Sequence, residues 1–311
     1  MGYPKVTVVG AGQVGATAAF LLLLKGIADV VLVDVVEGVP QGKALDMSHS
    51  RSVERFGPKV TGINGYDGTE RSDVVVVTAG LPRKPGMTRE DLLAANAGIV
   101  RSVIGEVAPR SPDAVLLCVT NPLDVMTDLA WKVSGMPAGR VLGMGGVLDS
   151  ARFAFYIAEE TGAAIDEVEA LVVGAHGDTM VPLPRHSSVA GKALIDVLAP
   201  GRVAEVVRRT VSGGAEVVAH LKTGSAFYAP AASVAAMVAA IVGDTGAVLP
   251  SCVRLEGEYG IEGVHLSVPA SLGRSGVRGV PELDLDDAEL AALRASADGV
   301  AAQVASLGPE V

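Results

Sequence analysis

Short runs of consecutive apolar residues, most of them valine, recur in the first part of the chain. They occupy Val6–Val9, Val30–Val33, Val74–Val77 and Val115–Val119. Continuous runs of this kind, as opposed to alternating ones, are typical of strands in a parallel sheet that is covered on both faces. Segments of helical pattern separate them, at Val14–Lys25, Pro40–Ser50 and Arg89–Val107, and another runs from Asn121 through Trp131. This order predicts an α/β fold with an open, doubly wound parallel sheet.

The regular alternation ends near Gly145. Helical segments follow at Val147–Thr161, Val203–His220 and Ala231–Val242, and strand-like pieces lie at Glu169–Val173, Val181–Pro182, Val248–Arg254 and Val264–Val268. Mixed elements without regular alternation favour an α+β arrangement. We therefore predict two domains, residues 1–145 and residues 146–311. Since no serine- or proline-rich linker separates them, we expect the two domains to pack against each other.

The end of the chain is predicted to form one helix. Asp286 and Glu289 resemble a capping box at its start. An apolar stripe at a spacing of three to four residues follows, formed by Leu290, Leu293, Ala297, Val300, Val304 and Leu307. Packing against the core is favoured over a coiled coil, because the stripe covers only about two heptads.

The composition agrees with two packed domains. The chain has 311 residues, of which 49% are hydrophobic and 19% charged, so a disordered protein is excluded and a large core is expected. The net charge of -10 argues against a nucleic-acid partner and against an anionic membrane. Cys118 and Cys252 form no C-x-x-C pair, so neither a metal site nor a disulfide scaffold is predicted.

The compartment is predicted from the apolar stretches. Strand-like sequence begins by Lys5, which leaves no room for a signal peptide. The stretch Val14–Val33 is interrupted by Lys25 and Asp29, and Ala226–Val242 falls short of the roughly 20 apolar residues that a membrane span needs. We interpret both as buried helices and predict a cytoplasmic protein.

A glycine-rich motif follows the first strand. Residues 10–15 read GAGQVG, which is G-x-G-x-x-G between a predicted strand and a predicted helix. In this context Gly10 allows a tight turn, Gly12 lets the backbone approach a pyrophosphate, and Gly15 lets helix and strand pack closely. The helix N-terminus stabilises the phosphate charge. The predicted cofactor contacts in this loop are Gly10, Ala11, Gly12, Gln13, Val14 and Gly15.

An acidic residue, Asp34, ends the second strand. A carboxylate at this position accepts hydrogen bonds from the adenosine ribose hydroxyls and repels a 2′-phosphate, which favours NAD over NADP. The alternative is a glycine-rich turn with no ligand and a strand-end Asp that is merely hydrated. The strand–loop–helix context favours the cofactor site.

Further motifs cover most of the chain. They are VEGVPQGKALDM at 36–47, GLPRKPGMTRED at 80–91, VTNPLDVMT at 119–127, GVLDSARF at 146–153, GAHGDTMVPL at 174–183 and KTGSAFYAPAAS at 222–233. With them the chain resembles, nearly end to end, the lactate/malate dehydrogenase family. Within that family it is most similar to the bacterial NAD-dependent malate dehydrogenases of the lactate-dehydrogenase-like type. The resemblance implies a Rossmann domain that binds NAD and a C-terminal α+β domain that binds substrate.

The segment GAHGD places His176 among glycines at the end of an apolar strand. An imidazole titrates near neutral pH, so it can take a proton from a hydroxyl and return it to a carbonyl oxygen. The resemblance implies that Asp149 orients this ring and stabilises its charged form. Without the second motif, a strand-end His and a helix-cap Asp would be the simpler interpretation.

Three arginines match the family's substrate contacts. Arg152 follows Asp149 by three residues, so both lie on one side of a helix, and it corresponds to the clamp on the substrate's C1 carboxylate. Arg89 and Arg83 lie in a loop that resembles the family's mobile lid. Arg89 corresponds to the arginine that polarises the substrate carbonyl. Arg83 corresponds to the position that discriminates substrates, where lactate enzymes usually carry Gln and malate enzymes carry Arg.

Asn121 ends the fourth strand in the motif VTNP. The resemblance implies that its amide contacts the substrate hydroxyl and the nicotinamide ribose. By the same resemblance Asn96 and the segment Val119, Thr120 and Asn121 contact NAD. Gly224 and Ser225 match small residues beside the substrate in the family, with a register uncertain by one position. His186 stands where relatives often have an aromatic or aliphatic residue.

The predicted function is reversible oxidation of (S)-malate to oxaloacetate with NAD, by a homodimer or homotetramer. Three arginines in one pocket explain how an acidic protein binds a dianion. Two alternatives remain: a lactate or broad 2-hydroxy-acid dehydrogenase, for which position 83 is the discriminator, and a non-catalytic NAD-binding protein with the same fold. The set His176, Asp149, Arg152 and Arg89 argues against the second.

Overall fold

The computed structural model of the protein describes residues 2–82 and 88–308. Of Arg89 it describes the backbone but not the side chain. Six parallel strands form the first half of a large sheet, with the order β3-β2-β1-β4-β5-β6. This order is that of the doubly wound dinucleotide-binding fold, so the predicted fold class is confirmed. The strands are β1 (Lys5–Val9), β2 (Asp29–Val33), β3 (Val60–Ile63), β4 (Val74–Val77), β5 (Val115–Cys118) and β6 (Val141–Gly143).

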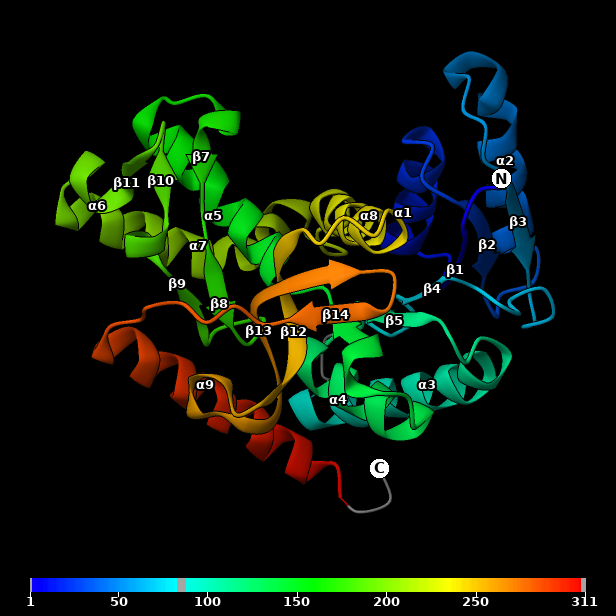
Figure 1. Ribbon diagram of the computed structural model, residues 1–311. Coiled ribbons are helices and arrows are strands. Elements are labelled where there is room, and N and C mark those ends of the chain that lie inside the picture. Colours follow the sequence, from blue (N-terminus) through cyan, green and yellow to red (C-terminus); the bar gives the residue numbers. More distant parts are fainter. Residues whose placement is uncertain (1, 83–87, 309–311) are drawn as a thin grey trace.

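The sheet continues into the second half of the chain without a break. Beyond β6 come antiparallel strands in the order β12-β13-β8-β9, and β14 pairs with β13, so that eleven strands of the described chain share one sheet (Figure 1). They are β12 (Val248–Glu256), β13 (Glu262–Gly273), β14 (Gly276–Gly279), β8 (Val172–Gly174) and β9 (Met180–Pro182). The two halves are therefore joined by backbone hydrogen bonds as well as by packed side chains.

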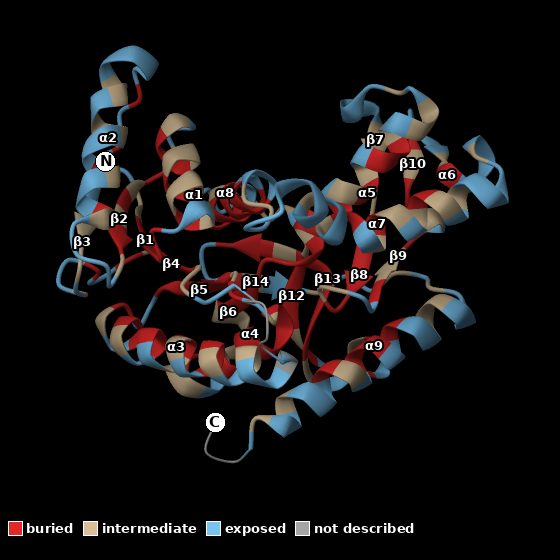
Figure 2. Cartoon of the chain, turned by 180° about the vertical axis from the view of Figure 1, so that it is seen from behind, coloured by how far each residue is buried: buried red, intermediate tan, exposed pale blue. Residues whose placement is uncertain are grey.

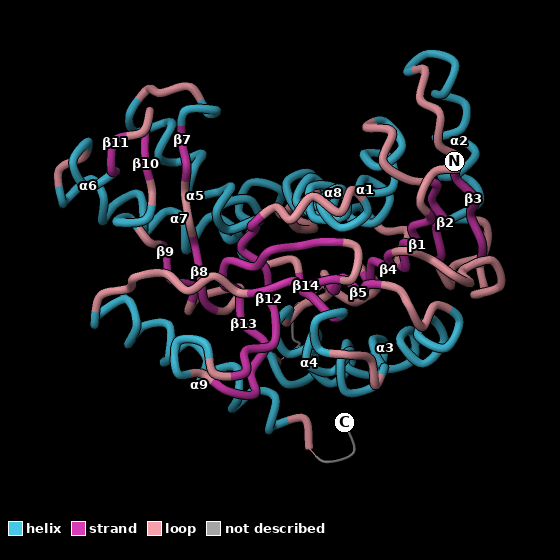
Figure 3. Tube along the Cα trace, viewed as in Figure 1, coloured by secondary structure: helices cyan, strands magenta, loops and turns pink. Residues whose placement is uncertain are grey.

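Helices cover both faces of the sheet (Figure 3). On one face lie α1 (Gln13–Leu24) and α8 (Tyr228–Val242), and on the other α3 (Arg89–Arg110), α4 (Leu123–Ser134) and α9 (Asp287–Ser306). The remaining helices are α2 (Val39–Glu54), α5 (Gly146–Thr161), α6 (Leu194–Val197) and α7 (Pro200–Leu221). A separate small sheet joins β7 (Val168–Glu169), β10 (Ser188–Val189) and β11 (Lys192–Ala193). Burial follows this layering, with buried residues gathered along the central sheet (Figure 2).

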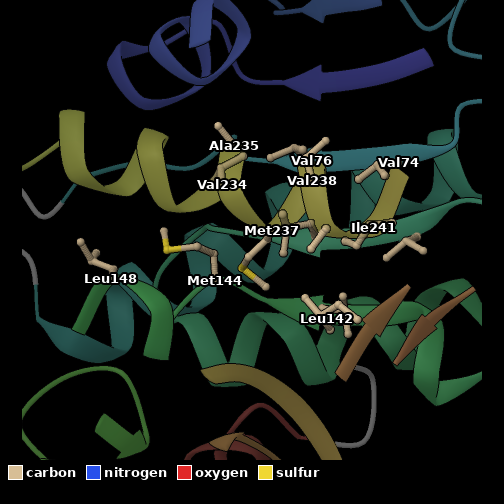
Figure 4. Packing of buried hydrophobic residues seen from close by; sticks show 14 of the residues in the cluster. Val74, Val76, Leu142, Met144, Leu148, Val234, Ala235, Met237, Val238 and Ile241 are labelled. Carbon is tan, nitrogen blue, oxygen red and sulfur yellow. The ribbon is translucent and has the colours of Figure 1, made fainter. Parts of the chain in front are cut away.

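Helix α8 belongs to the second half of the sequence but packs on the sheet of the first half. Helix α8 contacts β4, and its Val234, Val238 and Ile241 belong to the same buried cluster as Val74 and Val76 of β4 and Leu142 of β6 (Figure 4). The expectation that the two halves pack together is confirmed by this shared core.

Helix α3 is long and apolar enough, by length and composition alone, to resemble a membrane span over Glu90–Arg110. Its Val100, Ile104 and Val107 are buried against the sheet and α4, as in a core helix. Of the two stretches interpreted as buried helices, Ala226–Val242 is largely α8. The other, Val14–Val33, is wrong as a single helix, because Gly26 turns the chain from α1 into β2.

Two further expectations need correction. The predicted strand Glu169–Val173 is divided between β7 and β8, which belong to different sheets. Strands β3 and β6 were not predicted, because β3 is a partly exposed edge strand and β6 is only three residues long.

The C-terminal helix and its capping box are confirmed: the Asp286 carboxylate accepts the backbone N–H groups of Ala288 and Glu289. Leu293, Ala297 and Val300 are buried, as core packing requires.

Gly143 lies at the junction of the two halves, paired with Cys118 on one side and Cys252 on the other. A Cβ atom here would lie 2.5 Å from the Thr127 hydroxyl and 2.9 Å from the Cβ of Cys252. Neither neighbour can retreat without moving α4 or β12, so the site is fully packed.

We predict that Gly143→Ala lowers the free energy of unfolding by about 1–3 kcal/mol, the usual cost of overpacking a core. The measurement is urea denaturation. Gly105→Ala is the control: Gly105 is exposed in α3 with nothing within 4 Å of an added Cβ, and alanine there favours the helix. An equal loss of stability in both variants would contradict the role given to the junction.

Candidate active site

A cavity of about 420 Å³ lies where the two halves meet. The first half contributes the start of α1 and the loop after β5, and the second half contributes α5, α7 and the segment before β9. Open α/β sheets bind ligands beyond the carboxyl ends of their parallel strands, which is the position of this cavity. The predicted site residues that line it are Val14, Val119, Asn121, Arg152, His176 and Ser225.

The glycine loop has the geometry that the motif predicts. Gly10 has a φ of 103°, and a Cβ there would lie 2.6 Å from the Thr78 hydroxyl. A Cβ at Gly15 would lie 1.9 Å from the Gly10 carbonyl oxygen, so α1 can cross the loop only because this residue is glycine. At Gly12 an added Cβ meets nothing within 4 Å, so the N-terminus of α1 has an open side. The loop therefore fits a pyrophosphate.

The Asp34 carboxylate lies beside this loop. Its Oδ2 accepts the Ala11 backbone N–H at 2.7 Å, and its Oδ1 accepts that of Val36 at 3.0 Å. The side chain is partly exposed, and each oxygen has a further lone pair for a ligand hydroxyl. The loop is also held from α2, where the Lys43 ammonium group donates to the Ala11 carbonyl at 2.6 Å. Sequence analysis missed Lys43, although it lies in the quoted motif VEGVPQGKALDM.

Asn96 and Thr120 fix the backbone around the cavity. The Asn96 amide donates to the Asn121 carbonyl at 2.7 Å, and its oxygen accepts the Leu81 N–H at 2.7 Å. Asn96 is 2% exposed, so its amide is occupied by backbone rather than displayed to a ligand. The Thr120 hydroxyl donates to the Ala79 carbonyl at 2.7 Å. Both residues thus shape the site in which Asn121 is exposed.

The structure brings His176, Asp149 and Arg152 together. The Nδ1 of His176 lies 2.8 Å from Oδ2 of Asp149, and the other carboxylate oxygen lies 3.4 Å from the Arg152 guanidinium. Asp149 is 2% exposed, while both partners reach the cavity and are 16% exposed. With Nδ1 bonded to the carboxylate, Nε2 is the ring nitrogen that remains to exchange a proton with a ligand.

Electrostatics favours the protonated ring. Burial alone would lower the pKa of His176, but the charge and hydrogen bond of Asp149 outweigh burial and hold that pKa above its usual value. The Asp124 carboxylate acts in the same direction, and the Arg152 guanidinium opposes it. The site therefore keeps a larger fraction of the ring protonated than an isolated histidine would have at the same pH.

Two features of the site gave no clear signal in the sequence. The Arg152 side chain lies against Gly213 and Gly214 of α7, where an added Cβ would be 3.5 Å from its Cδ and 3.6 Å from both terminal guanidinium nitrogens, respectively. Asp124, at the start of α4, accepts the backbone N–H of His176 at 2.9 Å. An Asp in the first turn of a helix usually acts as a cap, so its sequence position alone indicates nothing more.

Other predicted residues lie elsewhere or outside the description. Arg83 is outside the described residues, and Arg89 begins α3 with its side chain undescribed. His186 lies away from the cavity, with its Nε2 3.8 Å from the Glu289 carboxylate. Ser225 lines the cavity, whereas Gly224 is not among its lining residues.

Two further observations bear on ligands. Over residues 2–82 and 88–308, no three His, Cys, Asp or Glu side chains gather as metal ligands would. A second cavity of about 450 Å³, between α4, β13 and α9, contains none of the predicted site residues. The ion pair Lys132–Asp128 lies in its wall at 2.7 Å.

We predict that Asp149→Asn lowers the pKa of His176, because it removes the charge and hydrogen bond that outweigh burial. An opposite charge within hydrogen-bonding distance typically shifts a pKa by 1–3 units, so a fall of at least about one unit is expected. The measurement is an NMR titration of the ring in histidine-labelled protein. An unchanged titration would mean that Asp149 does not control the protonation of His176.

The chain is similar to known proteins along nearly its whole length. Residues 4–143 match the family described as lactate/malate dehydrogenase, NAD binding domain, and residues 146–307 match the lactate/malate dehydrogenase, alpha/beta C-terminal domain. A malate dehydrogenase of Roseiflexus castenholzii is 49% identical over 304 residues, which are 98% of each chain.

Two solved structures illustrate the similarity in three dimensions. The malate dehydrogenase of Cryptosporidium parvum has a TM-score of 0.95 and 42% identity, covering 98% of this chain and 99% of that one. The lactate dehydrogenase of the same organism, solved with lactic acid and NAD, has a TM-score of 0.95 and 40% identity, covering 99% and 98%. The backbone alone thus matches enzymes named for either substrate.

Proposed function

Because the chain belongs to the lactate/malate dehydrogenase family, we propose that it is an NAD-dependent malate dehydrogenase that interconverts (S)-malate and oxaloacetate. The observation that carries this proposal is the contact of His176, Asp149 and Arg152 in a cavity next to the glycine loop. A non-catalytic NAD-binding protein has no need of this arrangement, since binding requires only the loop and Asp34.

The residues of the first half fit NAD. The open N-terminus of α1 at Gly12 accommodates the pyrophosphate, and the Asp34 carboxylate accepts the ribose hydroxyls. When bound, NADH would supply the hydride for reduction, and NAD would accept it in the oxidation. The family match of residues 4–143 to an NAD binding domain agrees with this donor set.

The chain's own groups supply the proton and the orientation. Arg152 holds the C1 carboxylate of the substrate through paired hydrogen bonds. His176 gives the proton from Nε2 to the oxygen of oxaloacetate, and takes it back from the hydroxyl of malate. Asp149 stabilises the imidazolium during both transfers. Arg89 polarises the carbonyl and Arg83 binds the C4 carboxylate; these two roles rest on the family resemblance.

The setting of the enzyme is part of the proposal. We infer a Rossmann domain at residues 1–145 and a substrate domain at 146–311, which the limits of the two family matches support. We also infer that the enzyme is cytoplasmic and forms a homodimer or homotetramer. The net charge of -10 favours a protein that binds neither nucleic acid nor an anionic membrane.

The experiment that tests the function compares NADH oxidation with oxaloacetate, pyruvate and 2-oxoglutarate side by side. We expect oxaloacetate to be reduced with the highest kcat/KM. His176→Asn should still bind NADH but lose roughly 10²–10⁴-fold in turnover, the usual contribution of a general acid–base group. Near-normal turnover in that variant would mean that another group carries the proton.

A second prediction concerns the cofactor. The Asp34 carboxylate meets a 2′-phosphate with like-charge repulsion, so NADH should be preferred over NADPH by at least about tenfold, or about 1.4 kcal/mol. Asp34→Asn keeps an acceptor for the Ala11 N–H and should narrow this preference. Equal kcat/KM values with both cofactors in the wild-type enzyme would rule out the role of Asp34.

A third prediction concerns the second carboxylate, which oxaloacetate has and pyruvate lacks. With pyruvate, Arg83 would lose its partner at a cost of roughly 2–4 kcal/mol, or 30- to 1,000-fold in kcat/KM. Arg83→Gln should therefore lower efficiency on oxaloacetate and raise it on pyruvate. Arg152→Lys is the matched control, since it should impair both substrates about equally. The idea fails if the oxaloacetate/pyruvate ratio is unchanged in Arg83→Gln.

A further inference from the structure

A second carboxylate lies behind the histidine of the site. Asp124 is 4% exposed, and its Oδ2 accepts the backbone N–H of His176 at 2.9 Å. Its other oxygen, Oδ1, is fully buried and accepts no hydrogen bond within the described chain. Asp124 and Asp149 thus approach the same residue from two helices, α4 and α5, with Asp149 at the ring and Asp124 at the backbone.

Small residues make this approach possible. A Cβ at Gly145 would lie 2.7 Å from Cδ2 of Leu123, 2.9 Å from the Ser267 hydroxyl and 3.3 Å from the Cβ of His176. Any larger residue at 145 would separate the start of α4 from the histidine segment. The packing therefore buries the Asp124 carboxylate beside His176. An apolar side chain at this position would not carry the cost of burying a charge.

Asp124 is buried without a lysine or arginine partner among the described side chains that act on it. Burial raises the pKa of its carboxyl to about 6, with the hydrogen bond and charge of His176 acting against burial. The other groups that act on its pKa are the Cys252 thiol on β12, which lowers it, and the Asp149 carboxylate on α5, which raises it. The group of opposite charge that Asp124 has at hand is therefore the imidazolium of His176.

We propose that Asp124 is a positioning residue that anchors the backbone of His176 and stabilises the imidazolium from the backbone side of that residue. This proposal rests on the proposed function, in which His176 carries the reacting proton. Asp149 orients the ring and stabilises its charge directly, and Asp124 adds the field of a second negative charge that reaches the ring without touching the substrate.

A purely structural role would need only the hydrogen bond to the His176 amide. Asparagine keeps an acceptor oxygen at this position and removes the charge, so Asp124→Asn separates the two roles. Asp128→Asn is the matched control. Asp128 lies one turn further along α4, is 3% exposed, and contacts a different histidine, with 3.0 Å between its Oδ1 and Nδ1 of His265.

The first measurement is independent of any reaction. Histidine-labelled protein contains five rings, and His176→Asn assigns the resonance of interest. We expect Asp124→Asn to lower the pKa of His176 by about one unit, the lower end of the effect of a nearby opposite charge. Asp128→Asn should leave His176 unchanged and alter the titration of His265. An unchanged His176 titration in Asp124→Asn overturns the proposal.

The second measurement is the pH dependence of kcat/KM in both directions. Reduction needs the protonated ring, so its decline at high pH should move down by about one unit in Asp124→Asn. Oxidation needs the neutral ring, so its decline at low pH should move down by the same amount. Above the wild-type pKa, reduction should fall by up to about tenfold while oxidation is unchanged; between the two pKa values, reduction falls by less and oxidation rises. Equal losses in both directions without a pH shift would indicate a backbone anchor alone.

Stability provides a third outcome. A carboxyl whose pKa is raised on folding contributes stability below its unfolded value, and this contribution is lost as the pH rises through about 6. The Tm of Asp124→Asn, measured relative to that of wild type, should therefore rise between pH 5 and pH 7.5. If neither Asp124→Asn nor the smaller Asp124→Ser folds, the carboxylate is structural and the proposal is wrong. Lack of dehydrogenase activity in wild type would refute the proposed function but leave the ring titration decisive for Asp124.

Discussion

The site depends on the hydrogen-bonded junction between the two halves of the sheet. At Gly143 the parallel strands of the first half pass into the antiparallel strands of the second, and β6 pairs with both β5 and β12. Because the junction is made of backbone, the glycine loop on one side and His176 on the other belong to one frame. A site that needs sub-ångström agreement between two substructures benefits from such a connection.

Within this frame, the charge that lines the cavity is opposite in sign to the net charge of the molecule. The chain as a whole is acidic, with a net charge of -10. In the cavity, Arg152 supplies a local positive charge, and His176 is held towards its protonated form by Asp149. The two acidic side chains near the ring are almost entirely buried, so a dianion meets cationic groups while the carboxylates act on the ring from within.

Much of the fold could be read from residues whose patterns are local. Four valine-rich runs and the loop GAGQVG predict the parallel sheet and its ligand edge, because burial on both faces and a tight turn each leave a sequence trace. The motifs containing His176, Asp149 and Arg152 predict a constellation that the structure assembles. The contact of Asp124 with His176 joins residues 52 positions apart, and the packing of Arg152 on Gly213 and Gly214 joins two separate helices; neither follows from local pattern.

The placement of α8 has a consequence for synthesis on the ribosome. Val74 and Val76 of β4 emerge early, but helix α8, which packs on β4 in the same buried cluster, emerges far later. Until then this face of the nascent sheet lacks the cover of α8, and exposed apolar surface of that kind promotes aggregation. The first half of the chain is therefore a dinucleotide-binding unit by sequence, but its core is incomplete during translation. It can complete its folding only when the second half has been synthesised.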